Sequence, residues 1–173
     1  MTSNQNWKTQ TEPGTSSGTS GKTRSQDVTD HLGVYTSYDE VPARYRLSNF
    51  AFAFAGRNVW DEYLDARDDL AESTKTRTYR WAFSAWASFI EGDRGTHHAL
   101  ATPDQFEAFI TQERAEYTDR TVYKQRFAPL WGFYEWLAYH VEYPHRFNVA
   151  LLAAAQGGAA HEMWRYRWQS NRE

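Results

Sequence analysis

Large apolar residues recur every three or four positions along the middle of the chain, which is the spacing that gathers side chains on one face of an α-helix. The longest such stripe consists of Tyr123, Phe127, Leu130, Tyr134, Leu137 and Val141. Thr118 or Asp119 is the expected cap, and Pro129 should kink this helix because it removes one backbone hydrogen bond. The pattern predicts an all-α fold with successive helices from Asn58 to about Gln156.

The same spacing predicts a helix over Val59 to Glu72 and a second one over the stretch from Ser73 to Ile90. Gly92 and Gly95 should end the second helix, since glycine readily adopts the left-handed turn that stops helices. The apolar faces of these two helices are formed by Trp60, Tyr63, Leu64, Arg67 and Leu70, and by Tyr79, Phe83, Trp86 and Ile90.

Two shorter stretches are predicted to be helical from their caps. Thr102 offers a hydroxyl cap, Pro103 suits the first helical position, and Gln105 stands where a capping box needs it. Further along, Asn148 should cap a short helix that ends at Ala155.

The remaining segments lack a clear helical stripe. Residues 1–33 are rich in Ser, Thr, Gly, Gln and Asn, so we expect a disordered tail. Residues 34–56 are expected to be an extended aromatic segment, because Phe50-Ala-Phe52-Ala-Phe54 alternates with period two. Residues 57–156 form the predicted helical domain, and residues 157–173 a Trp- and Arg-rich C-terminal tail that could form one more helix.

Composition narrows the classes of function. A chain of 173 residues suits one domain plus tails, and 19 Lys and Arg against 22 Asp and Glu give no general basic character. A nucleic-acid partner would therefore need a local positive patch. The absence of Cys excludes disulfides and thiolate sites, and no run approaches the ~20 apolar residues of a membrane span. We expect a cytoplasmic protein that does not enter a membrane.

The familiar catalytic and nucleotide-binding motifs are missing from the sequence. His161-Glu162 resembles the start of a zinc motif, but Arg165 occupies the position of the second histidine. His97 and His98 are adjacent and are expected in a solvated loop. The sequence therefore predicts neither a metal, nor a cofactor, nor a catalytic residue. The acidic residues of the first helix are expected to form a solvated face: Asp61, Glu62, Asp65, Asp68, Asp69 and Glu72.

Cations mixed with hydroxyl and amide groups mark the starts of two predicted helices. A cation at a helix N-terminus opposes the helix dipole, so such a start suits a phosphate oxygen, and residues one turn further on can reach base edges. Ordinary solubilising charge is the competing interpretation, and periodicity alone does not separate the two. The candidate DNA-binding residues are Lys75, Thr76, Arg77 and Arg80 in one group, and Arg120, Thr121, Lys124 and Gln125 in the other.

The order of these parts resembles the core-binding, SAM-like N-terminal domain of the tyrosine recombinase (phage integrase) family. The resemblance covers about Asn58 to Ala154 and is carried by three stretches. They read DEYLDARDDLAESTKTRTYRWAFSAWASFI, ATPDQFEAFITQ and TDRTVYKQRFAPLWGFYEWL. It implies an orthogonal bundle of four to five helices that grips one side of a DNA duplex. It also implies that the starts of the second and fourth helices, with the eight residues named above, lie near the major groove.

The chain departs from this family after Ala155. Members carry a catalytic domain with two Arg residues, a His-x-x-Arg motif and a nucleophilic Tyr, and no His here is followed three residues later by Arg. Tyr166 lies between Arg165 and Arg167, but it lacks the surrounding cations that stabilise the pentavalent phosphate in this family. It is therefore interpreted as a surface or packing residue. The resemblance thus implies double-stranded DNA binding without cleavage, as an accessory or regulatory factor in DNA integration or recombination of a mobile element.

Two other classes of function stay open from the sequence. A full-length recombinase or a second copy of the chain is a further expected partner. The main alternative is a helical protein–protein interaction module, which would use an exposed patch of aromatic and Arg side chains. An enzyme of unrecognised type has little support. The patch of the interaction module would consist of Trp81, Trp131, Trp164 and Trp168.

Overall fold

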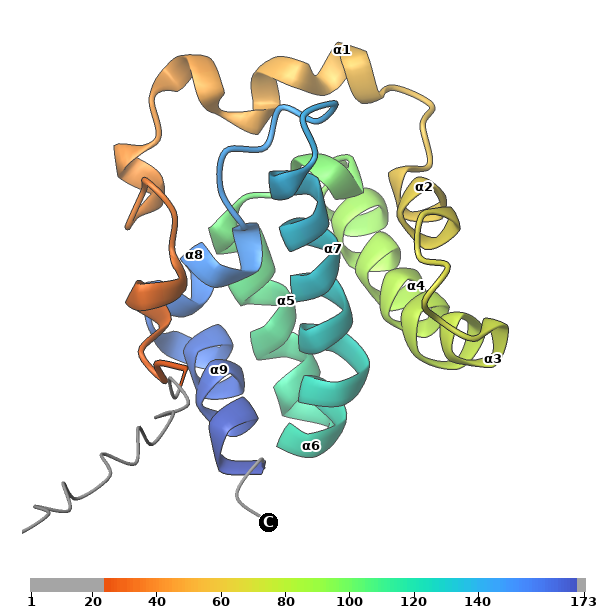
Figure 1. Ribbon diagram of the computed structural model, residues 1–173, viewed down its shortest axis with the longest axis vertical. Helices are drawn as coiled ribbons and strands as arrows, with labels where there is room; N and C mark the ends of the chain where they lie inside the picture. The colour runs from red at the N-terminus through yellow and green to blue at the C-terminus, as the bar shows by residue number, and fades with distance from the viewer. Residues whose placement is uncertain (1–23, 171–173) are drawn as a thin grey trace, which may run out of the picture.

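The computed structural model describes residues 24–170, and these residues form helices and turns with no strand (Figure 1). The all-α prediction is confirmed. The α-helices are α1 (Ala51–Phe54), α2 (Val59–Asp65), α3 (Glu72–Thr74), α4 (Trp81–Ala87), α5 (Pro103–Glu116), α6 (Asp119–Val122), α7 (Ala128–Tyr139), α8 (Val149–Ala155) and α9 (Gly158–Ser170).

Short 3-10 turns and wider π-helical stretches connect or extend these α-helices. Three π-helical stretches extend α-helices: η5 (Lys75–Arg80), η6 (Ser88–Asp93) and η8 (Tyr123–Phe127). The 3-10 turns are η1 (Val28–His31), η2 (Tyr38–Glu40), η3 (Ala43–Tyr45), η4 (Leu47–Phe50) and η7 (His98–Leu100). As a result, α3, η5, α4 and η6 form one continuous helix, and α6, η8 and α7 form another.

The second continuous helix passes through Pro129 without a break. A proline at this position leaves the carbonyl of Gln125 without its usual backbone donor. The side chain of Arg126 supplies a donor instead, with Nη1 at 3.1 Å from that carbonyl oxygen. The π-helical stretch η8 ends just before Ala128, and widened turns of this kind accommodate an irregular hydrogen-bond ladder. The helix then ends at Tyr139, so Val141, predicted to belong to its apolar stripe, is 97% exposed.

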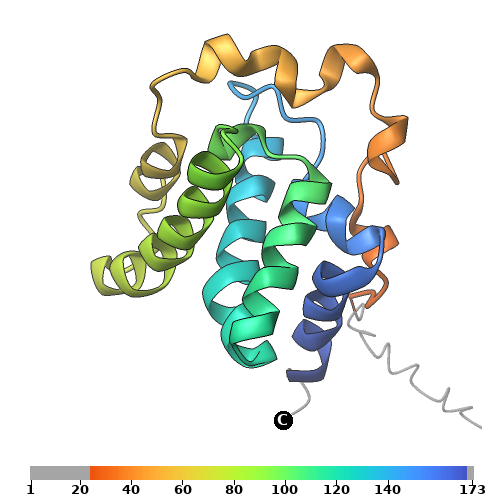
Figure 2. The ribbon, with the colours of Figure 1, turned by 180° about the vertical axis from the view of Figure 1, so that it is seen from behind.

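The core lies around α5 and α7, with α4 on one side and α8 and α9 on the other (Figures 1 and 2). Trp86 of α4 is fully buried and packs edge-on against Phe109 of α5, with ring centroids 5.0 Å apart. Its indole Nε1 donates to the Tyr134 hydroxyl at 3.0 Å. That hydroxyl in turn donates to the backbone carbonyl of His98 at 2.6 Å. The predicted apolar face of the second helix is therefore the face that meets the rest of the bundle.

The capping predictions for three helices are confirmed. Thr102 and Gln105 form the reciprocal capping box at the start of α5, and the Thr118 hydroxyl accepts from Thr121 N. Asn148 accepts from the backbone N–H groups of Ala150 and Leu151. These signals are reliable because each depends on residues within one helical turn.

Two predictions for the region before the bundle are wrong. Residues 34–56 are not extended; they form a series of short helical turns that crosses one end of the bundle (Figure 1). Phe54 is 1% exposed and Phe52 is 97% exposed, which fits a helical turn and not a strand, because residues two positions apart point to the same face of a strand. In addition, the first helix is shorter than predicted, because α2 ends at Asp65 and the following turns lead to Glu72.

The segments predicted as tails contribute to the core where they are described. Of residues 1–33, those from 1 to 23 lie outside the described residues. In the rest, Val28 is 3% exposed, and the backbone carbonyl of Gln26 accepts from Trp164 Nε1 at 2.8 Å. At the other end, α9 packs against α5 and α8, and Met163 is fully buried. The C-terminal segment up to Ser170 is thus an integral helix of the fold and no tail; residues 171–173 lie outside the description.

Among residues 24–170, no helix combines the length and the apolar character needed to cross a bilayer.

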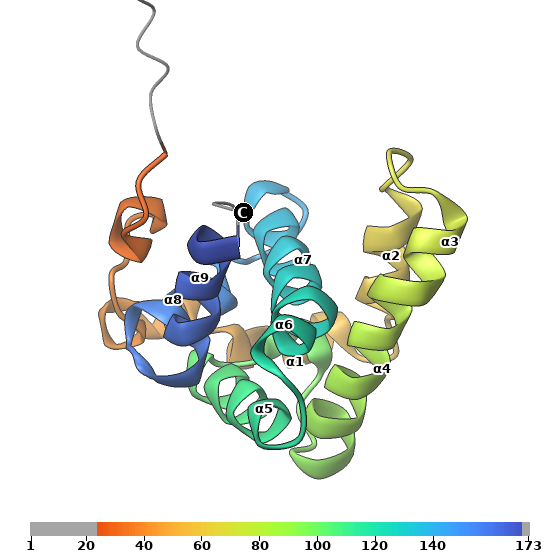
Figure 3. The same ribbon diagram turned by 90° about the horizontal axis from the view of Figure 1, so that it is seen from below.

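The view from below shows α4, α7 and α9 in a row, with α5 packed beneath α7 (Figure 3). Figure 1 shows that the two continuous helices, which carry the predicted cations, start at the same end of the bundle.

Candidate nucleic-acid interface

The two predicted cationic segments meet in the fold. The π-helical stretches η5 and η8 are in contact, and α4 also touches η8. Beside this contact lies an open depression of about 490 Å³. Four of the eight predicted DNA-binding residues line it, together with two further side chains of α4. The lining residues are Thr76, Arg77, Arg80, Gln125, Trp81 and Ser84.

The predicted cations differ in whether a carboxylate already compensates their charge. Arg77, Arg120 and Lys124 are exposed and form no ion pair with any described residue. Arg80 is half-exposed, and its Nη1 lies 3.2 Å from an Asp61 carboxylate oxygen. Exposed pairs of this kind contribute little stability, so Arg80 can exchange Asp61 for another anion at small cost. Three uncompensated cations and one exchangeable one remain for a phosphate backbone.

Lys75 does not belong with these cations. Its residue is 9% exposed, and its Nζ lies 3.3 Å from a carboxylate oxygen of Glu72, one turn earlier. A largely buried ammonium that is paired with a carboxylate is less accessible to a duplex than an exposed one. Lys75 is therefore a poorer candidate for direct contact than the exposed cations. The pattern of alternating hydroxyls and cations gave no sign of which cation would point inward.

The predicted hydroxyl residues also separate into two kinds. Thr76 is exposed on the depression, where its hydroxyl is available to a ligand. Thr121 is half-buried, and its hydroxyl accepts from the Thr118 hydroxyl at 3.1 Å as part of the cap of α6. Thr121 therefore stabilises the start of the helix and is a poorer candidate for direct contact.

Lys124 lines a second and larger hollow of about 730 Å³ between η5 and α7. Its walls include Tyr63, Tyr79 and Trp136. The other cation of this hollow, Arg67, donates to both carboxylate oxygens of Asp69 at 2.7 Å. Lys124, in contrast to Arg67, has no carboxylate partner among the described residues. Lys124 is adjacent in sequence to Gln125 of the smaller depression, and Glu135 also lines the larger hollow.

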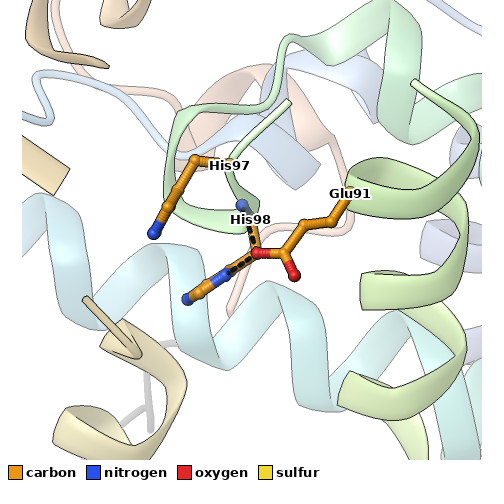
Figure 4. A group of neighbouring side chains, drawn as sticks. All are labelled: Glu91, His97 and His98. Atoms are coloured by element: carbon orange, nitrogen blue, oxygen red, sulfur yellow. Dashed lines mark hydrogen bonds and ion pairs between the residues drawn. The ribbon is translucent and has the colours of Figure 1, made fainter. Parts of the chain in front are cut away.

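His98 is buried at the edge of the core, which corrects the prediction of a solvated loop. It is 2% exposed, and burial lowers the pKa of its imidazole, although the hydrogen bond to Glu91 opposes this shift. His98 Nδ1 lies 2.5 Å from Glu91 Oε1, and Nε2 accepts from Val59 N at 3.1 Å. Both ring nitrogens are therefore engaged in hydrogen bonds within the fold, and Figure 4 shows the one with Glu91.

His97 lies next to His98 and Glu91, close enough for the three side chains to surround a cation (Figure 4). Its Nδ1 accepts from Ala99 N at 3.1 Å, and its Nε2 lies 2.8 Å from the carbonyl oxygen of Arg57, to which it must donate. Neither imidazole thus offers a free lone pair to a metal. The group joins η7 to the helices around it and does not fit a metal centre.

The four tryptophans predicted as one exposed patch do not form one. Trp164 is 1% exposed, and Trp131 and Trp168 are half-buried beside it. All three indoles surround the Arg167 guanidinium, at 4.4 to 5.3 Å from ring centroid to Cζ. Trp81, in contrast, is 62% exposed and lies on the depression beside η5. The protein–protein interaction module, in the form predicted from the sequence, therefore lacks its exposed patch of four tryptophans.

Trp81 and Ser84 are the lining residues that the sequence interpretation did not assign to the DNA surface. Trp81 follows Arg77 by four positions, and Ser84 follows Arg80 by four, so each shares a helical face with a predicted cation. The spacing would have indicated both. Tyr166 packs against Tyr123 with ring centroids 5.4 Å apart, as expected of a packing aromatic.

Comparisons of this chain with protein-family models, with curated proteins and with solved structures find no match. The functional conclusion therefore rests on the chemistry of this surface.

Proposed function

We propose that this chain binds double-stranded DNA through the surface where η5 meets η8. The observation that carries the proposal is the depression that joins Arg77, Arg80 and Gln125 from two separate helices. Exposed cations bind phosphates, and a neighbouring amide can pair with a base edge. Arg120 and Lys124, both exposed, add positive charge on the same helix as Gln125.

The overall charge makes this local arrangement necessary. The chain has a formal net charge of −3, so long-range attraction to DNA is not expected from the molecule as a whole. Binding must come from the few uncompensated cations and should be sensitive to salt. The local group of uncompensated cations, together with the resemblance to the recombinase core-binding domain, supports an accessory or regulatory role in DNA integration or recombination.

A gel-shift experiment at low salt with a duplex of about 25 base pairs, which is roughly two and a half helical turns, tests the proposal. Wild-type protein should retard the duplex, and the double variant Arg77→Ala, Lys124→Ala should bind it at least tenfold more weakly. Arg165→Ala is the matched control, because Arg165 is an exposed arginine on α9 that pairs with Glu162. The proposal is wrong if wild-type protein leaves the duplex unshifted.

The proposed role excludes strand cleavage. Incubation with a supercoiled plasmid should leave its topology unchanged, and denaturing gels should show no covalent protein–DNA adduct. A covalent adduct that disappears in the Tyr166→Phe variant would contradict the non-catalytic role. It would leave DNA binding itself intact.

A further inference from the structure

Trp81 differs from the other tryptophans of the described chain. Trp60, Trp86, Trp131, Trp136, Trp164 and Trp168 each pack against at least one other aromatic ring. Trp81 has no aromatic partner among residues 24–170, and it is 62% exposed. Exposed indole of this size is unfavourable in water, and such a ring is a typical anchor for a ligand.

The surroundings of this indole carry charge and hydrogen-bonding groups. Arg77, one helical turn before Trp81, has no carboxylate partner among the described residues, and Arg80 is adjacent in sequence. Gln125 of η8 lines the same depression from the neighbouring helix. An aromatic face, a guanidinium and an amide are the groups that bind a nucleotide through its base face, its phosphate and its base edge.

An intact duplex cannot use the face of this indole. Its base faces are covered by the neighbouring base pairs, and only the edges and the phosphates are open to a protein. A base that has left the stack exposes both faces, and it can stack on an aromatic side chain. The positive charge beside Trp81 favours such a nucleotide over an apolar protein segment.

We propose that Trp81 receives an unpaired base, so that the chain prefers DNA in which one base is displaced from the duplex. This inference rests on the proposed function, because the cations of the same surface hold the adjoining duplex. Arg77 would bind a phosphate next to the displaced base, and Gln125 would contact its edge.

Two duplexes of equal length test this, one fully paired and one with a single unpaired adenine at its centre. Fluorescence anisotropy at one fixed salt concentration should give about fivefold tighter binding of the bulged duplex, the lower end of what stacking on an aromatic residue provides. Trp81→Ala should bind both duplexes equally, at the affinity of wild type for the paired one. Trp81→Phe should keep part of the preference.

The control is Phe52→Ala, which removes an aromatic side chain that is 97% exposed on α1; it should keep the full preference. If wild-type protein binds both duplexes equally, the inference is wrong while the proposed DNA binding stands. If it binds neither, both fail. A bulge preference that persists in Trp81→Ala also overturns the inference, since another residue then receives the base.

Replacing the bulged adenine with 2-aminopurine gives a second readout. Stacking on an indole quenches this fluorophore, so wild-type protein at saturation should lower its emission, and Trp81→Ala should not. Equal emission with both proteins at saturation would show that the base does not lie on Trp81.

Discussion

Tyr134 shows how a single buried hydroxyl can join three parts of the fold. It accepts from Trp86 Nε1 and donates to the His98 carbonyl, and its residue is fully buried. Tyr134→Phe keeps the ring but leaves the Trp86 indole N–H and the His98 carbonyl buried without this hydrogen-bond partner. We expect a loss of about 1–3 kcal/mol in the free energy of unfolding, the usual cost of buried unpaired groups.

Urea unfolding monitored by circular dichroism measures this loss. Tyr139→Phe is the control, because Tyr139 is 79% exposed on the same helix and should lose almost nothing. Equal stability of Tyr134→Phe and wild type would contradict the role assigned to the hydroxyl.

His145 gives the fold a dependence on pH. It is 3% exposed, its Nε2 lies 2.6 Å from the Ala99 carbonyl oxygen, and burial lowers its pKa to about 4. The unfolded chain, with a histidine pKa near 6.5, therefore binds a proton between about pH 6.5 and pH 4 that the folded chain does not. Stability should fall as the pH falls through this window, by up to about 1.4 kcal/mol per pH unit.

The free energy of unfolding at pH 7.5 and at pH 5 checks this expectation. This range lies above the ordinary pKa of the carboxylates, but burial raises the pKa of Glu135, which acts in the opposite direction. A histidine variant is therefore needed to isolate the histidine contribution. His98, whose pKa burial also lowers, contributes in the same direction as His145. His145→Asn should reduce the difference between the two pH values. An unchanged difference would contradict the role assigned to His145.

At the scale of elements, α9 depends on a carboxylate from another helix. Glu107 of α5 accepts from the backbone N–H groups of Ala159 and Ala160, at 2.5 and 2.9 Å. A negative charge at this end also complements the helix dipole. Glu107→Ala should cost about 1 kcal/mol of stability, as loss of a cap does.

Thermal unfolding measures the effect, and Glu116→Ala, which removes an exposed carboxylate from the same helix, is its control. Gly158→Ala gives an independent check. Its φ is +76°, and a Cβ there would overlap the Glu107 carboxylate, so this variant should be destabilised as well. If both Glu107→Ala and Glu116→Ala leave the melting temperature unchanged, Glu107 is not a functional cap.

The sequence was sufficient for the elements whose signals are local. The caps at Thr102, Thr118 and Asn148 act within one turn and were predicted correctly. The alternating Phe50-Phe54 segment was not predicted correctly, and the C-terminal segment was expected as a possible helix but not as part of the core. Both outcomes depend on the surfaces that these segments cover. Trp164 looks exposed in a segment rich in charge, yet it fills a space between α7 and Gln26 that no local pattern encodes.

At the scale of the whole molecule, the sequence indicated two cationic helix starts but not which of their side chains would share a surface. Arg77 and Gln125 line one depression only because η5 packs against η8. Lys75, on the same helix as Arg77, is buried instead. Which face of a helix turns inward is decided by its neighbours, and a cation with a long aliphatic stem can occupy either face.

The salt dependence of DNA binding tests the central claim most directly. Anisotropy titrations of one duplex at several salt concentrations give the slope of log Kobs against log salt, which is about −0.9 per neutralised phosphate. The variant Arg77→Ala, Arg120→Ala, Lys124→Ala should reduce the magnitude of the wild-type slope by up to about 2.7, which is three phosphate contacts. Arg165→Ala should leave the slope unchanged. A triple variant with the same slope as wild type would contradict the assignment of this surface to DNA.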